Sequence, residues 1–84
     1  MNNVIMRRVV VTDTYQPLSN SKVVASVTLA CLPTNKREVF FRGDDGSDVP
    51  WVPGEWHDFW SVNLNEIVIK GEPDDVVTVI GGTW

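Results

Sequence analysis

Short valine-rich segments recur at even intervals along this chain, and their spacing constrains the fold more than any other feature. In Lys22–Leu32, apolar side chains at alternate positions would share one face of an extended strand, while smaller or polar ones would share the other. No segment repeats apolar residues at the i, i+3, i+4, i+7 spacing of an amphipathic helix over three turns. The sequence therefore predicts an all-β fold.

Seven such segments are predicted to be strands, and clusters of glycine, proline, asparagine and aspartate separate them. They are Val4–Thr12, Lys22–Leu32, Glu38–Arg42, Val49–Val52, Glu55–Val62, Glu66–Lys70 and Asp75–Gly81. A chain of 84 residues has room for one domain. We therefore expect residues 1–84 to form a small antiparallel β-sandwich or jelly-roll-like barrel of about seven short strands.

The small size of the chain implies a thin stability margin, because a domain this short buries only about 60–65% of its unfolded surface. Disulfides, metals or partner subunits commonly stabilise such domains. Cys31 is the single cysteine, and its place in a strand predicts a buried, unreactive thiol. One cysteine and one histidine are too few to hold a structural zinc ion. We therefore expect oligomerisation or docking to supply the additional stability.

The opening segment, "MNNVIMRRVVV", lacks the pattern of a secretory signal peptide, because its arginines follow the first apolar residues. No apolar run approaches the roughly 18–20 residues of a membrane span. These features predict a soluble product that is made in the cytoplasm and has no membrane partner.

The net charge of −4 argues against nucleic acid as a partner. The charge is unevenly distributed, since residues 1–42 carry a balance of +4 and residues 43–84 a balance of −8. If the fold keeps this polarity, neighbouring subunits attract one another, which suits a heterologous ring or lattice. If strands from both halves interleave, the polarity averages out.

The acidic stretch "RGDDGSD" (Arg42–Asp48) follows a predicted strand, and its Asp-Gly pair is typical of a hairpin turn. A calcium site is the alternative, and its ligands would be Asp44, Asp45, Ser47 and Asp48. These acids crowd together, however, and lack a closing glutamate at the required distance. The RGD tripeptide is a short match without a secretion signal. The sequence favours a turn with no metal site.

Glu55 and His57 share one face of a predicted strand, so their side chains are placed where they can form a catalytic dyad. A small sandwich offers little concavity for a substrate, and no serine or cysteine nucleophile motif accompanies the histidine. We therefore expect no catalytic residue and no cofactor.

The chain is dense in tryptophan, with Trp51, Trp56 and Trp60 in one short region and Trp84 at the last position. Trp56 and Trp60 share a strand face with Asp58. Three interpretations stay open at this point: core packing, a protein interface, and a platform for sugar rings.

Several segments follow one another in an order that is similar to that of a known protein family. A strand with "SVTL" leads to "EVFFRG", then to Val52-Pro53-Gly54-Glu55, and finally to "IVIKGEPDDVVTVIGG". Over roughly Leu18 to Gly82 this pattern resembles short structural proteins of tailed phages and the β-sandwich modules of phage heads and tails. The shared positions are hydrophobic and turn positions, so no binding motif transfers from the family.

The resemblance implies a non-enzymatic virion protein, and specifically a capsid decoration (cement) protein that binds between major capsid subunits. It also implies a homo-oligomer, with a trimer favoured by analogy with other cement proteins. The alternatives are a tail, neck or spike module, and a small carbohydrate-binding module that uses its tryptophans.

Residues 1–8 would form an extended arm that orders on the shell, unless Val4–Thr12 is simply the first strand. In the arm, apolar residues would enter a groove and arginines would pair with acids. The expected interface residues are Val4, Ile5, Met6, Arg7, Arg8, Trp51, Trp56, Trp60 and Trp84.

Overall fold

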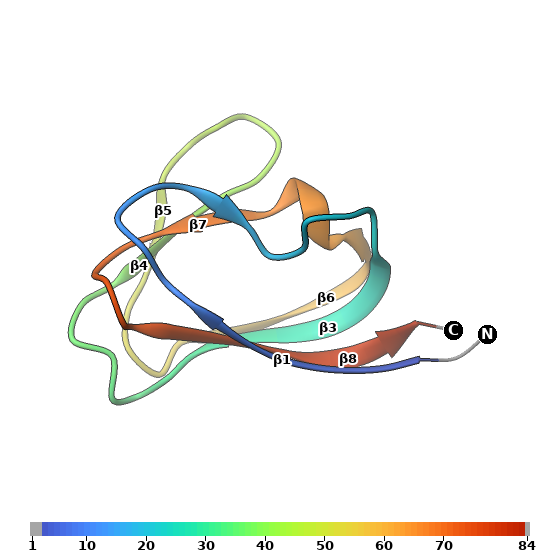
Figure 1. The fold of residues 1–84 in the computed structure, drawn as a ribbon, viewed down its shortest axis with the longest axis horizontal. Coiled ribbons are helices and arrows are strands. Elements are labelled where there is room, and N and C mark those ends of the chain that lie inside the picture. The colour runs from blue at the N-terminus through green and yellow to red at the C-terminus, as the bar shows by residue number, and fades with distance from the viewer. Residues whose placement is uncertain (1–2, 84) are drawn as a thin grey trace.

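The computed structural model describes residues 3–83, which form two packed antiparallel sheets of four strands each (Figure 1). The long sheet contains, in spatial order, β1 (Asn3–Val10), β8 (Val76–Thr83), β3 (Val24–Cys31) and β6 (Trp56–Asn63). The short sheet contains β2 (Gln16–Pro17), β7 (Val68–Lys70), β4 (Val39–Arg42) and β5 (Val49–Trp51). One 3₁₀ turn, η1 (Leu64–Glu66), joins β6 to β7.

The strand order is that of a jelly roll. The spatial orders are 1-8-3-6 in one sheet and 2-7-4-5 in the other, and every neighbouring pair is antiparallel. All connections cross from one sheet to the other except the one between β4 and β5. Eight strands arranged in this way make two interlocked Greek keys. The predicted all-β sandwich of jelly-roll type is therefore confirmed.

All seven predicted strands are present, with small shifts at their ends. The strand predicted at Glu66–Lys70 begins only at Val68, because Leu64–Glu66 form the 3₁₀ turn. The Asn63 side chain caps that turn by accepting the Asn65 N–H at 3.1 Å. The eighth strand, β2, has two residues, which is too short to show an alternating pattern.

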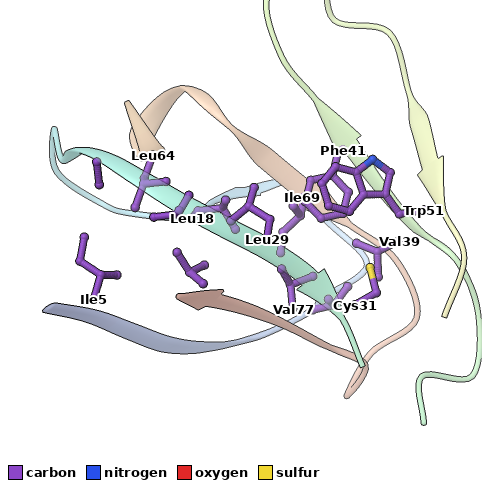
Figure 2. Packing of buried hydrophobic residues seen from close by; sticks show 14 residues of the cluster. Ile5, Leu18, Leu29, Cys31, Val39, Phe41, Trp51, Leu64, Ile69 and Val77 are labelled. Atoms are coloured by element: carbon purple, nitrogen blue, oxygen red, sulfur yellow. The ribbon is translucent and has the colours of Figure 1, made fainter. Parts of the chain in front are cut away.

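The core lies between the sheets and consists of the inward-facing side chains of alternate strand residues (Figure 2). In β3 these are the apolar residues that the alternation placed together, and Leu29 is fully buried. Cys31 is also buried, as predicted, and desolvation raises the pKa of its thiol to about 12. The thiol is therefore protonated at neutral pH, which makes it a poor nucleophile.

The segment considered as an arm is a strand. From Asn3 opposite Thr83 to Val10 opposite Val76, β1 pairs with β8 along its whole length (Figure 1). Residues 3–8 therefore belong to the first strand of the sandwich and do not form an extended arm. Positions 1 and 2 lie outside the described residues. Ile5 is only 5% exposed and belongs to the core, so its assignment to an interface is wrong.

Candidate functional site

The outer face of the long sheet carries exposed apolar side chains from all four of its strands. We call this set the apolar face, and its members are Val4, Met6, Val10, Val24, Trp56, Trp60 and Ile80. An antiparallel sheet with one face in water normally presents polar residues there. A large exposed apolar patch usually marks an interaction site. This face is therefore the leading candidate for a functional surface.

The strand register explains why these residues lie together. Met6 in β1 is directly opposite Ile80 in β8, and Ile80 is in turn opposite Thr28 in β3. Met6 is 75% exposed, although its cross-strand neighbour is also apolar. A shallow groove runs beside Ile80 and Trp60. The groove has a polar border, because the Thr28 hydroxyl donates to the Asp58 carboxylate.

The tryptophans divide between the surface and the core. Trp56 and Trp60 are well exposed on the apolar face, and Trp60 is 74% exposed. Trp51 is only 5% exposed, and its ring stacks on Phe41 with 3.7 Å between ring centroids (Figure 2). Trp51 is therefore a core residue rather than an exposed one, while Trp84 lies outside the described residues.

Two arginines of β1 are exposed, but only Arg8 points to the apolar face, because it alternates in step with Met6 whereas Arg7 alternates in step with the buried Ile5. Arg7 and Arg8 are both exposed, as are Val4 and Met6. Arg8 lies opposite Thr78, one row along the sheet from Met6 and Ile80. Four of the five predicted interface residues in this segment are thus accessible to a partner, although from a strand rather than from an arm.

Glu55 and His57 lie together, as their shared strand face predicts. The Glu55 carboxylate is 2.7 Å from His57 Nε2 and accepts the Val52 N–H at 3.0 Å. The bond to His57, followed by the bond from Val52, lowers the pKa of Glu55 below its ordinary value. The same carboxylate closes the Val52–Glu55 turn, in which Gly54 has a φ of +86°. Its contacts therefore give Glu55 a role in holding this turn.

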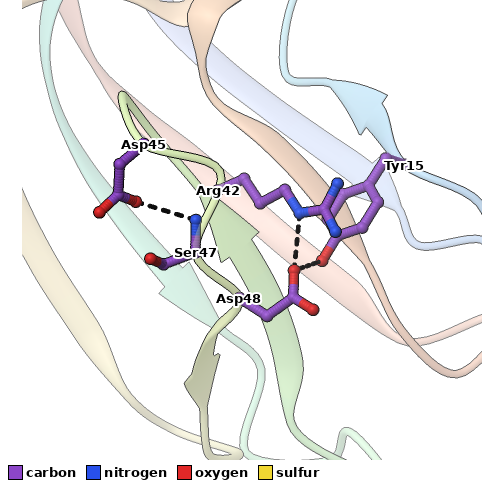
Figure 3. A network of polar contacts seen from close by, with 5 residues as sticks. All are labelled: Tyr15, Arg42, Asp45, Ser47 and Asp48. Carbon is purple, nitrogen blue, oxygen red and sulfur yellow. Dashed lines mark hydrogen bonds and ion pairs between the residues drawn. The ribbon is translucent and has the colours of Figure 1, made fainter.

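The acidic stretch forms a turn, as predicted, and the carboxylates of Asp45 and Asp48 have protein partners (Figure 3). Gly46 has a φ of +74°, and Asp45 accepts the Ser47 N–H at 2.9 Å. Asp48 accepts hydrogen bonds from the Tyr15 hydroxyl and from Arg42 Nε, the latter at 2.6 Å. The Arg42 guanidinium lies 3.9 Å from the centroid of the Tyr15 ring. Among residues 3–83 no group of three or more potential ligands is arranged to hold a metal ion.

Asp48 should make stability fall at acid pH. Its hydrogen bonds, first from Tyr15 and then from Arg42, lower its pKa in the folded state. The bound carboxylate stabilises the fold above the unfolded pKa of about 3.9, and this contribution is lost as pH falls through the lower folded value. We expect Asp48→Asn to be less stable than wild type at pH 7, and we expect this deficit to shrink as pH falls below about 4. Urea unfolding at several pH values measures this. Asp44→Asn, in the same loop, is the control and should follow the wild-type curve, whereas a D48N deficit unchanged at pH 2 would contradict the assignment.

Within residues 3–83 the structure contains no helix that is long and apolar enough to cross a membrane. The chain matches no protein-family model, no curated protein and no solved structure in comparisons with known proteins.

Proposed function

We propose that this chain is a non-enzymatic virion structural protein, a capsid decoration protein that binds between major capsid subunits. The observation that carries the proposal is the apolar face, where Met6, Ile80 and Trp60 are exposed on one sheet surface. Exposed tryptophan and aliphatic side chains with a polar border are typical of the centre of a protein interface.

Two further features support a virion component. The sequence resembles phage structural proteins between Leu18 and Gly82, and the jelly roll is a common architecture of viral capsid domains. The fold also serves unrelated functions, so the apolar face and the resemblance carry the assignment rather than the fold alone.

A homo-oligomer, with a trimer favoured, is part of the proposal. Exposed Arg7 and Arg8 on β1 are separated by two strands from Asp58 on β6, so opposite edges of the long sheet differ in charge. Such an arrangement favours a head-to-tail contact between copies. The resemblance to cement proteins is what favours three copies.

Ile80→Lys should reduce binding to shells that lack this protein by at least tenfold. A lysine in the centre of the apolar face would have to lose its hydration when the face is covered, and hot-spot losses of about 2 kcal/mol correspond to roughly thirtyfold in affinity. Cosedimentation of purified chain with such shells measures the affinity, and thermal unfolding checks the fold.

Val52→Lys is the matched control, because Val52 is 57% exposed but lies outside the apolar face. It should bind as wild type does. Equal binding by wild type and I80K, or no binding of wild type to any shell, would contradict the proposal. Particle imaging separates a shell protein, with many copies over the surface, from a tail, neck or spike module confined to one vertex.

A second candidate function is carbohydrate binding, and one observation favours it. Trp56 and Trp60 are exposed on either side of Asp58 on the same strand face. Flat aromatic rings beside a carboxylate suit the apolar faces and hydroxyl groups of sugars. A glycan array combined with tryptophan fluorescence titration distinguishes this function from shell binding.

A further inference from the structure

A cleft opens between the two sheets on the side of the sandwich where β5 and β6 form the edges. Its floor is apolar and consists of Phe41, Trp51, Phe59 and Ile67. The rings of Trp51 and Phe59 are nearly parallel, 7° apart with centroids separated by 6.3 Å. The apolar part has a volume of about 220 Å³ and widens towards Asp44 and Glu66. This feature lies between the sheets and is distinct from the apolar face.

The size of this hollow suits a side chain better than a free small molecule. Sites for small molecules usually enclose about 300–1,000 Å³, which is more than the apolar part provides, and the adjoining wider part of about 730 Å³ is open to solvent rather than enclosed. The hollow also adjoins a strand edge, because β6 pairs with β3 on one side and, among the described residues, with no strand on the other. An open edge beside an apolar hollow is the arrangement that accepts an added strand.

The geometry of β6 fixes where the side chains of an added strand would point. Phe59 of β6 lines the cleft, whereas Trp56 and Trp60 point to the opposite, outer face. A strand laid beside β6 would follow the same alternation. Its inward residues would enter the hollow over Trp51 and Phe59, and its outward residues would lie beside the exposed tryptophans.

The charges around this edge select the chemistry of the added strand. Asp58 lies on β6 and Glu55, which is bound to His57, immediately precedes it, while Asp44 and Glu66 line the wider part of the cleft. Arg42, which also borders the cleft, is paired with Asp48. Cationic side chains on the outer side of the added strand would meet Asp58 and could lie over the faces of the exposed tryptophans.

We propose that the β6 edge and the adjoining cleft form a strand-addition site for an extended, cationic segment of a partner protein, with alternate apolar residues entering the cleft. The proposal goes beyond the docking of the apolar face, because it uses the backbone edge and the interior of the sandwich.

The probe is an acetylated and amidated KVRLKVR peptide, whose valines and leucine occupy one side of a strand and whose basic residues occupy the other. We expect saturable binding by titration calorimetry, with at least tenfold weaker binding by the Val49→Lys variant. Val49 is 49% exposed at the mouth of the cleft, so a lysine there would introduce a cation without unfolding the core. Val52→Lys lies in the adjacent turn and should bind as wild type does. A charge-reversed EVELEVE peptide should also bind at least tenfold more weakly.

Backbone methylation tests strand addition on the wild-type protein alone. In an antiparallel pair, alternate residues direct their N–H groups towards the neighbouring strand. Methylating the nitrogens of the apolar residues, or separately those of the basic residues, should abolish binding for one of the two sets only. This pattern would not arise from a purely electrostatic association.

The proposal is overturned if KVRLKVR shows no saturable binding at millimolar concentration, if V49K binds it as wild type does, or if both methylated sets bind equally. Concentration-dependent self-association that V49K abolishes would instead assign the site to a second copy of the chain. Shell binding by I80K tests the proposed function separately, because Ile80 lies outside the cleft. The two proposals can therefore fail independently.

Discussion

Replacing Gly81 with alanine should destabilise the domain by about 3 kcal/mol or more, because the new methyl group has no room. A Cβ atom at this position would lie 2.0 Å from the Ser26 carbonyl oxygen and 2.7 Å from Val27 Cα. Both are backbone atoms of β3, so no side chain can rotate away to relieve the clash. The strand β8 would have to move away from β3, and it lies in the middle of the long sheet, between β1 and β3.

Urea unfolding followed by circular dichroism measures this loss. Gly43→Ala is the matched control, because a Cβ at Gly43 meets no atom within 4 Å, and a surface change of this kind should alter stability by less than about 0.5 kcal/mol. A domain of this size is stabilised by roughly 4–13 kcal/mol in total, so G81A removes a large share. Equal unfolding midpoints for G81A and G43A would show that the two strands are not held as closely as the structure has them.

The strands were predictable where alternation alone specifies burial. The predicted strand Lys22–Leu32 contains the whole of β3. The residues of β3 that point into the core are the alternate apolar residues that the sequence pattern assigned to one face. The same period assigned Trp56, Asp58 and Trp60 to one face, and the structure has all three exposed. Such patterns need no knowledge of the partner strand, because they follow from the pleat.

The features that the sequence did not specify depend on partners distant in the chain. β1 carries apolar residues and an arginine on each of its faces, and its neighbour β8 begins at Val76, so an arm and a strand could not be told apart. The apolar face likewise appears only when the topology brings Met6 beside Ile80. Neither residue alone would indicate an interface.

Buried polar contacts were also invisible in the sequence. Asp75 is buried, and its carboxylate accepts the Lys36 N–H at 2.9 Å and the Arg37 N–H at 3.1 Å. Asn35 is joined by two hydrogen bonds to the Val76 backbone. These bonds hold the loop before β4 against the start of β8. Their partners are about forty residues apart in sequence, so no local pattern reports them.

Trp51→Ala should destabilise the domain by about 3–5 kcal/mol, the usual cost of removing a buried aromatic side chain. The Trp51 ring stacks on Phe41, meets the His57 ring edge-on at 4.7 Å between centroids, and forms part of the cleft floor. Its removal would therefore leave a cavity between the two sheets, lined by rings that cannot close it. The sequence alone gave no reason to separate this tryptophan from its neighbours.

Trp60→Ala is the matched comparison, because Trp60 is 74% exposed and loses little packing when it is truncated. Its free energy of unfolding should change by less than about 1 kcal/mol, since surface substitutions usually have small effects. Trp51→Phe should recover part of the loss by restoring an aromatic ring against Phe41. If W51A and W60A unfolded at the same urea concentration, Trp51 would not be the core residue that its stacking and burial make it. A stability loss confined to W51A would instead show that the sandwich depends on Trp51 and not on Trp60.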